Sequence, residues 1–163
     1  MNARKHLPTA LSFLCAMGLA CASANGEART RFDGIRTTAY TYGADQNGSG
    51  NETRNALGKP LKTGKLQSAA ADWSQWPVGT HFRVVETGQE YVVDDTGSAL
   101  VGTNTIDLFK SSARAMNNWG VRHVTIEIIE WGSPEKSLDI LRDRTRVKHN
   151  REMVQKLEKV LAT

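Results

Sequence analysis

The chain has 163 residues, of which 39% are hydrophobic, and a formal net charge of +4. This length can bury the core of one domain without disulfides. The charge is uneven: residues 25–132 carry 11 Lys and Arg against 12 Asp and Glu, whereas residues 133–163 carry 8 against 5. Because a nucleic-acid-binding domain needs a basic face of its own, the near-neutral body argues against nucleic acid as a partner.

Residues 1–24 have the composition of a secretory signal peptide. Arg4 and Lys5 form a short basic region, and a mostly apolar run follows from Leu7 to Ala22. Ala22-Ser23-Ala24 then fits the A-x-A cleavage pattern. We therefore predict export to the periplasm or the outer cell envelope, with residues 25–35 as a flexible segment before the domain.

Both cysteines, Cys15 and Cys21, lie within this segment. The exported chain would then contain no thiol, which excludes a cysteine nucleophile and a cysteine zinc site. A lipoprotein with lipid on Cys21 is the less favoured alternative. Bacterial lipoprotein signals resemble Leu-x-Gly/Ala-Cys, and Gly18 stands at the position of the leucine, three residues before Cys21. We expect no metal and no cofactor, since the histidines have no ligand spacing (His81, His123 and His149).

The elements of the mature chain are mostly short strands. Alternating Thr and Tyr predict the first strand, and polar residues then predict a long loop over residues 43–64. Thr87-Gly88 joins two strands as a hairpin, and Ser111 or Ser112 can cap a short helix that runs through Asn118. Many short strands with one short helix indicate a small β-barrel. The predicted strands are 36–42, 81–86, 90–93 and 121–130.

Ser133-Pro134-Glu135 is a strong helix start, and residues 133–163 are predicted to form a basic C-terminal α-helix. Apolar residues recur in it at seven-residue spacing (Ile140, Val147, Val154 and Leu161). Two interpretations are open: the helix lies against its own barrel, or it contacts an anionic envelope surface or a coiled-coil partner.

Three aspartates stand within or beside apolar runs. Asp94 and Asp95 end the run that begins at Tyr91, and Asp107 lies between Ile106 and Leu108. Carboxylates are rarely placed among apolar residues unless something pairs or uses them. The pattern predicts an acid/base site, although any one of these residues alone could serve to fix a turn.

Asp95-Thr96-Gly97-Ser98 also matches the active-site tetrapeptide of pepsin-like and retroviral aspartic proteases. In those enzymes two carboxylates share one proton. This chain has one copy of the motif, so such an enzyme would have to be a homodimer.

A third interpretation uses more of the chain. Several short motifs, in their order along the chain, resemble the three-aspartate (3D) domain, which is related to the catalytic barrel of the membrane-bound lytic transglycosylase A family. The resemblance implies a mainly β domain over residues 36–132, built as a six-stranded double-psi β-barrel that cleaves peptidoglycan glycan strands. The motifs are Thr38-Ala39-Tyr40-Thr41, Ala71-Asp72, Pro77-Val78-Gly79-Thr80, residues 94–102, Ile106-Asp107-Leu108-Phe109 and Asn118-Trp119-Gly120-Val121.

The resemblance also implies roles for single residues. Asp107 falls on the acid/base aspartate, Asp95 on a second family aspartate that orients or tunes it, and Asp72 on the first, for which a structural role is favoured. Asp94, Thr96 and Gly97 would support the site. The chain departs from the family at Ser98, Val101 and Thr105, the last two being positions where a cation is usual or frequent. A non-catalytic wall-binding barrel is therefore the alternative to an enzyme.

Aromatic residues near these motifs are candidates for stacking on sugar rings. We predict Tyr40, Tyr42 and Trp76 as substrate-binding residues, with Trp73 as a further candidate. Aromatic residues at strands and turns are also common in cores, so this role competes with simple packing. The predicted partner is the peptidoglycan glycan strand.

Overall fold

The computed structural model describes residues 30–43 and 53–163. The predicted signal peptide and the alternative of a lipid on Cys21 lie outside the described residues. Among the residues that are described, no helix is both long enough and apolar enough to cross a bilayer.

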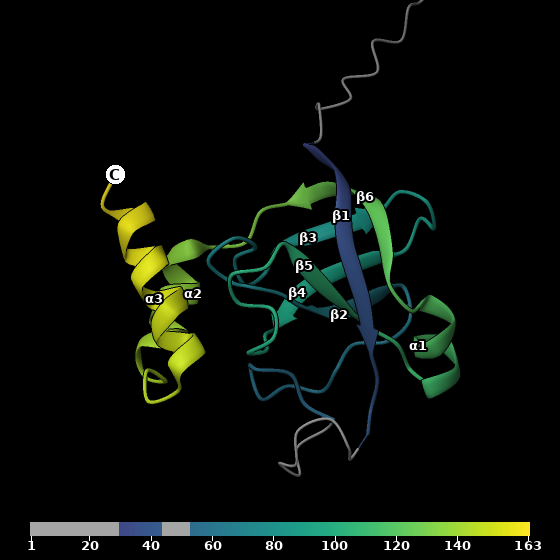
Figure 1. Cartoon of the computed structure of the whole chain (residues 1–163), viewed down its shortest axis with the longest axis horizontal. Coiled ribbons are helices and arrows are strands. Elements are labelled where there is room, and N and C mark those ends of the chain that lie inside the picture. Colours follow the sequence, from purple (N-terminus) through teal and green to yellow (C-terminus); the bar gives the residue numbers. More distant parts are fainter. Residues whose placement is uncertain (1–29, 44–52) are drawn as a thin grey trace, which may run out of the picture.

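Six strands close into a barrel in the order β1-β5-β2-β4-β3-β6 (Figure 1). Neighbouring strands are antiparallel except for two parallel pairs, β1 with β5 and β2 with β4. The strands are β1 (Arg31–Tyr40), β2 (Leu66–Ala70), β3 (His81–Val84), β4 (Glu90–Asp95), β5 (Thr105–Phe109) and β6 (Arg122–Glu130).

The strand order has an internal two-fold symmetry. Exchanging β1 with β4, β2 with β5 and β3 with β6 gives the same neighbours in the same relative directions. Each half contributes one strand to each parallel pair, as in a double-psi barrel. The predicted fold class, mainly β with a six-stranded double-psi barrel, a short internal helix and a C-terminal α-helix, is confirmed.

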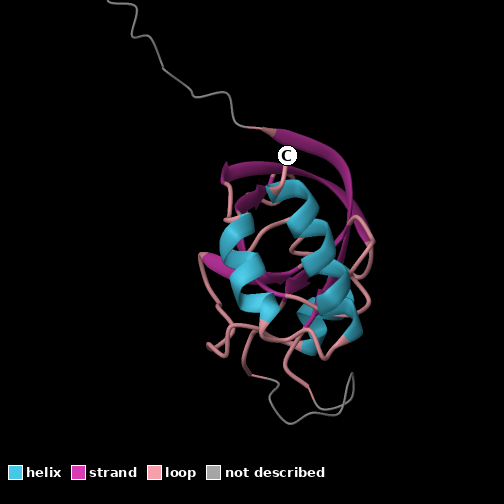
Figure 2. Cartoon of the chain, turned by 90° about the vertical axis from the view of Figure 1, so that its left-hand side faces the viewer, coloured by secondary structure: helices cyan, strands magenta, loops and turns pink. Residues whose placement is uncertain are grey.

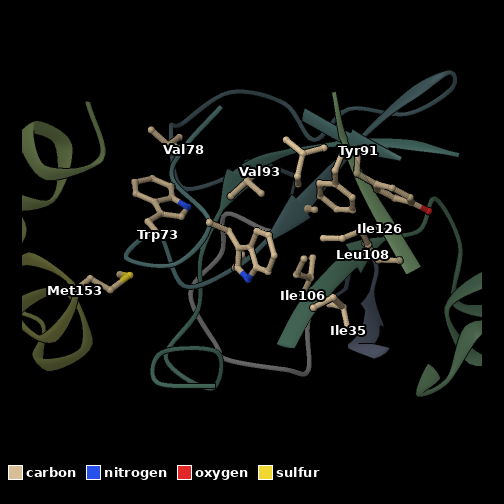
Figure 3. Close-up of a cluster of buried hydrophobic side chains, with 14 of the residues drawn as sticks. Ile35, Trp73, Val78, Tyr91, Val93, Ile106, Leu108, Ile126 and Met153 are labelled. Atoms are coloured by element: carbon tan, nitrogen blue, oxygen red, sulfur yellow. The ribbon is translucent and has the colours of Figure 1, made fainter. Parts of the chain in front are cut away.

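Alternating apolar residues fill the barrel. On β6, Val124, Ile126 and Ile128 are buried while the residues between them are partly exposed, as the period-two pattern predicts. Figure 3 shows Ile126 beside Leu108 and Tyr91 within the cluster of buried side chains.

The first strand begins earlier than the sequence predicts. β1 starts at Arg31, within the segment expected to be flexible, and pairs with β6 from its first residue. Asp33-Gly34 resembles a turn, but here it forms an irregularity within the strand between Phe32 and Ile35. Gly34 has φ +68°, which a glycine adopts without strain, so the strand continues past it.

The short internal helix α1 (Ala113–Trp119) follows the sequence prediction closely. The Ser112 side chain accepts a hydrogen bond from the backbone N–H of Ala115, and Gly120 ends the helix at φ +59°. The two caps fix the helix between β5 and β6.

The C-terminal segment forms two helices where one was predicted. α2 (Pro134–Arg142) and α3 (Lys148–Leu161) fold into a hairpin beside the barrel, and Figure 2 shows them side by side. Leu138 and Leu141 of α2 are buried in the same apolar cluster as Met153 and Leu157 of α3. We refer to α2, α3 and the turn between them as the helical hairpin.

A turn separates the two helices because polar side chains bind its carbonyl groups. Asn150 Nδ2 donates to the carbonyl of Arg144, and Arg151 donates to those of Thr145 and Arg146. The residues at seven-residue spacing therefore do not form one stripe. Of these, Val154 is buried, whereas Val147 and Leu161 are exposed.

Gly132 connects β6 to the helical hairpin through a close backbone approach. A Cβ atom at this position would lie 2.4 Å from the carbonyl oxygens of Pro77 and Val78 and 2.5 Å from the nitrogen of Thr80. Nearby, Ser137 Oγ of α2 accepts a hydrogen bond from the Val78 N–H at 2.9 Å. Only glycine fits this junction.

Candidate active site

Asp95 and Asp107 lie in one row, that is, among residues opposite one another on neighbouring strands of the barrel. Thr38 of β1 is opposite Asp107 of β5, Asp107 is opposite Ala70 of β2, and Ala70 is opposite Asp95 of β4. Residues opposite each other in a sheet point to the same face. The Asp95 and Asp107 side chains therefore share a face, with one strand between them, so their Cα atoms are about 10 Å apart at ordinary strand spacing.

A bulge in β4 brings Asp95 onto this face. Ala69 is opposite Val93, but the next residue, Ala70, is opposite Asp95, so Asp94 is the extra residue. Without the bulge, Asp95 would point to the same face as Val93, which is completely buried in the core. Bulges often redirect a side chain next to an active site.

Asp107 keeps one carboxylate oxygen available. Its Oδ1 accepts a hydrogen bond from Thr38 Oγ1 at 2.6 Å, and no hydrogen bond among the described residues uses Oδ2. Burial is the main cause that raises the pKa of Asp107, and the charge of Asp95 raises it further. The Thr38 hydrogen bond and the charge of Arg36 oppose this rise without cancelling it.

Asp95 is held by three donors. Its Oδ1 accepts the backbone N–H groups of Ala56 and Thr96, both at 2.9 Å, and its Oδ2 accepts the Tyr40 hydroxyl at 3.0 Å. Burial raises the pKa of Asp95, although these hydrogen bonds act in the opposite direction. Burial and the charge of Asp95 also raise the pKa of Tyr40 far above its ordinary value, so this phenol stays a donor.

The two carboxyl groups are therefore not equivalent. Both oxygens of Asp95 accept hydrogen bonds, and hydrogen bonds to a carboxylate stabilise its ionised form. Among the described residues Asp107 has fewer donors and one oxygen without a donor, so it is the better candidate to carry a proton and deliver it.

Asp94 has polar partners of its own, apart from this pair. It is 2% exposed, forms an ion pair with Lys62 and accepts a hydrogen bond from Ser68 Oγ at 3.1 Å. Its Oδ1 is buried without a hydrogen-bond partner among the described residues. Asp94 thus supports the site through its place in the bulge and through its charge, which raises the pKa of Asp95.

Asp72 connects loops next to the site. Its carboxylate accepts hydrogen bonds from the N–H groups of Ser74 and Gly102 and from Ser74 Oγ, and Lys156 of α3 lies 3.4 Å from its Oδ2. Burial alone would raise the pKa of Asp72, but these donors and the charge of Lys156 outweigh it, so the pKa is lowered. This ionised, fully bonded group has the geometry of a structural anchor.

The predicted aromatic residues have different surroundings. Tyr42 is 39% exposed and packs edge-on against Phe109, so part of its ring can meet a ligand. The Tyr40 ring packs against Phe109 as well, and its hydroxyl is engaged by Asp95. Trp73 is completely buried, and its Nε1 donates to the Asp95 carbonyl at 2.8 Å.

Trp76 is a correction to the sequence prediction. It is 5% exposed and lies in the core, stacked on Trp131 at 6.0 Å between ring centres and contacted edge-on by Phe32. Its ring has no free face for a sugar. Trp131, which is 47% exposed, is the aromatic residue that this cluster presents to solvent.

Sequence reasoning missed two groups that contact the aspartates. Thr38 lies in one of the quoted motifs, and its opposition to Asp107 becomes visible only with the register of β1 and β5. Ala56 contributes a backbone N–H from a loop, for which its side chain gives no signal. Gly97 lies in the turn after Asp95, where its carbonyl accepts the N–H of Leu100.

A second titratable cluster lies at the end of β5. Lys110 Nζ donates to the Tyr91 hydroxyl at 2.5 Å and lies 4.4 Å from the centre of the Trp119 ring. Burial and the nearby charge of Arg122 lower the pKa of Lys110 to about 8. Tyr91 stays protonated in this range, because burial raises its pKa to about 12.

The Lys110 cluster predicts a pH-dependent stability. The pKa of Lys110 falls from 10.5 to about 8 on folding, so the unfolded chain binds more protons between these values. The free energy of unfolding should therefore gain a contribution as pH rises through this window, and Lys110→Met should remove it. Denaturation at about pH 7.5 and about pH 9.5 measures this. If the free energy of unfolding differs between wild type and variant by the same amount at both pH values, the lowered pKa of Lys110 is contradicted.

Among the described residues, no group of three or more His, Cys, Asp or Glu side chains is arranged to hold a metal ion. In comparisons with known proteins, the family model of the 3D domain matches residues 67–130, from β2 to the end of β6. A search of the curated proteins found no match. Residues 67–130 are thus similar to the 3D domain, and β1, which contributes Thr38 and Tyr40 to the site, lies before the matched range.

Proposed function

We propose that this chain, whose residues 67–130 match the family model of the 3D domain, is an exported enzyme that cleaves the glycan strands of peptidoglycan. Asp107 acts as general acid and base, and Asp95 supports it electrostatically. The observation that carries the proposal is the shared row of Asp107 and Asp95. Within the part of the chain that the structure describes, Asp107 has one oxygen without a donor, whereas both oxygens of Asp95 accept hydrogen bonds.

The acid step requires a raised pKa. An ordinary aspartate has a pKa of about 3.9, so only about one in a thousand is protonated at neutral pH. A useful general acid must be raised towards the working pH. Burial and the charge of Asp95 both act on Asp107 in this direction.

The proposed reaction needs one proton and no added water. Asp107 transfers its proton to the glycosidic oxygen while the bond from that oxygen to the sugar's C1 breaks, which leaves positive charge on the ring. The Asp107 carboxylate then takes the proton of the sugar's 6-hydroxyl as that oxygen bonds to C1 and closes an anhydro ring. The internal nucleophile is already in place, so a second carboxylate that activates water is not obligatory.

The barrel supplies a cation beside one of the two positions where the family's cation is missing. Arg36 of β1 is opposite Thr105 in the register, and its Nη1 donates to Thr105 Oγ1 at 3.1 Å. A guanidinium therefore lies beside position 105 although the residue there is threonine. This exposed cation is suited to contact an anionic group of the wall polymer.

The proposal is tested by incubating the purified protein with isolated sacculi and identifying the released fragments by mass spectrometry. Anhydro-muropeptides support the proposed reaction, whereas hydrolysed sugar ends would replace the internal nucleophile by water. Cosedimentation with sacculi without released fragments would contradict catalysis and favour the wall-binding barrel. Peptide-bond cleavage would favour the aspartic protease.

Thr38→Val is expected to shift the pH dependence of this cleavage. The substitution removes the hydrogen bond that lowers the pKa of Asp107. The general acid then stays protonated to higher pH, so the alkaline limb of the rate profile should move upwards. Thr41→Val, a change outside the row of aspartates, is the matched control. An alkaline limb that Thr38→Val leaves in place, or moves downwards, would show that Asp107 is not the acid that sets it.

A further inference from the structure

The turn of the helical hairpin contacts the loop that lies against Asp95. Arg144 Nη1 donates to the carbonyl oxygen of Ala56 at 2.6 Å. The N–H of the same alanine donates to Asp95 Oδ1 at 2.9 Å. Ala56 is thus bonded through its carbonyl to the hairpin and through its N–H to the Asp95 carboxylate. The first of these bonds joins Arg144 to Ala56, which are 88 positions apart in the sequence.

The loop around Ala56 is a well-bonded turn. Asn55 Oδ1 accepts the N–H groups of Leu57 and Lys59, and the Asn55 carbonyl accepts the N–H of Gly58. These bonds fix the turn internally, so it can move as a unit. A contact at the Ala56 carbonyl therefore orients the Ala56 N–H as well.

The second donor to Asp95 Oδ1 also contacts the hairpin. The N–H of Thr96 donates to this oxygen, and its Oγ1 lies 3.8 Å from the Met153 sulfur of α3. Both residues whose backbone binds Oδ1 are therefore held by the same C-terminal element. The hairpin lies beyond the stretch that matches the 3D domain, which ends at residue 130.

We propose that Arg144 is a positioning residue for the aspartate pair: it holds Ala56 so that the Ala56 N–H stays on Asp95 Oδ1. The hairpin then acts as a brace for the site, and its own residues do not touch the substrate. The catalytic consequence of this brace rests on the proposed function, but the positioning itself does not.

The hydrogen bond from Ala56 favours the ionised form of Asp95, together with those from Thr96 and Tyr40. The titratable groups that face Asp95 are Tyr40, Asp94 and Asp107. The substitution of Arg144 replaces none of these three groups. Loss of Arg144 should therefore raise the pKa of Asp95 through the weakened Ala56 bond alone.

The test compares Arg144→Met with Arg142→Met by NMR of the full chain. Arg142 lies on the same hairpin, but its ion pairs go to Asp139 and Glu158. We expect Arg144→Met to raise the carboxyl titration midpoint of Asp95 and to make exchange of the Ala56 amide about fivefold faster, as for the loss of one ordinary hydrogen bond. Arg142→Met should change neither, and Arg144→Lys, which keeps a donor, should restore part of both.

The proposal is overturned if Arg144→Met leaves the Asp95 midpoint and the Ala56 exchange rate at their wild-type values, or if Arg142→Met changes them equally. Neither readout uses a substrate, so this failure is distinct from an absence of glycan cleavage. If the protein cleaves sacculi, Arg144→Met should also move the acid limb of the rate profile to higher pH, because Asp95 must be ionised.

Discussion

Asp107→Asn is expected to abolish glycan-strand cleavage and, at the same time, to stabilise the folded protein at neutral pH. A general acid contributes about 100- to 10,000-fold to a rate, and asparagine cannot supply the proton. The asparagine keeps an Oδ1 acceptor for Thr38, so the local hydrogen bond survives. The two effects have a single cause, which is the buried position of this carboxyl group.

The sign of the stability effect follows from the raised pKa. Burial and Asp95 raise the pKa of Asp107 in the folded state. The stabilisation that goes with a raised pKa is fully present below the unfolded value and is lost as pH rises through the folded value. At neutral pH the folded protein therefore either holds an unfavourable charge or keeps a proton that the unfolded chain has released, and asparagine removes this destabilisation in both cases.

Thermal unfolding of wild type and Asp107→Asn at neutral pH and at about pH 3 measures this effect. The gain of the variant should be seen at neutral pH and should disappear in acid, where wild type is protonated as well. Asp139→Asn, at an exposed carboxylate of α2, is the control and should change neither activity nor this pH dependence. If Asp107→Asn is instead less stable than wild type at neutral pH, this would contradict the raised pKa of Asp107 in the folded protein.

Gly132→Ala is expected to destabilise the protein strongly, by about 3 kcal/mol or more. The added Cβ would meet three backbone atoms, those of Pro77, Val78 and Thr80, at 2.4–2.5 Å. Backbone atoms cannot rotate away as a side chain can, so either β6 or the helical hairpin must shift.

Urea unfolding measures this cost, with Gly97→Ala as the matched control. A Cβ at Gly97 meets nothing within 4 Å, so this variant should stay within about 0.5 kcal/mol of wild type. Equal midpoints for Gly132→Ala and Gly97→Ala would mean that the junction tolerates a side chain and is looser than the structure shows.

The sequence predicts the barrel well because its signals are local. The alternation of β6, the Thr87-Gly88 hairpin and the caps at Ser112 and Gly120 each depend on residues a few positions apart. The order of the motifs along the chain then predicts the double-psi topology by resemblance. The sequence also singles out Asp95 and Asp107, and the structure places both on one row of the barrel.

The parts that could not be predicted depend on long-range pairing. The bulge at Asp94 is visible only when β4 is aligned with β2, and without it Asp95 would face the core. Trp76 has the same local appearance as an exposed turn aromatic, but Phe32 and Trp131 cover it. The single long C-terminal helix was a reasonable expectation from periodicity, and the packing of Leu138 and Leu141 with α3 overrides it.

The most direct test of this account is a carboxyl NMR titration of Asp107 in the wild-type protein. We predict a midpoint clearly above the value of about 3.9 for free aspartate, and a lower midpoint in Asp95→Asn, which lacks the neighbouring charge. A midpoint at or below the free value would mean that Asp107 is ionised whenever the protein works, and it could not then be the acid that breaks a glycosidic bond.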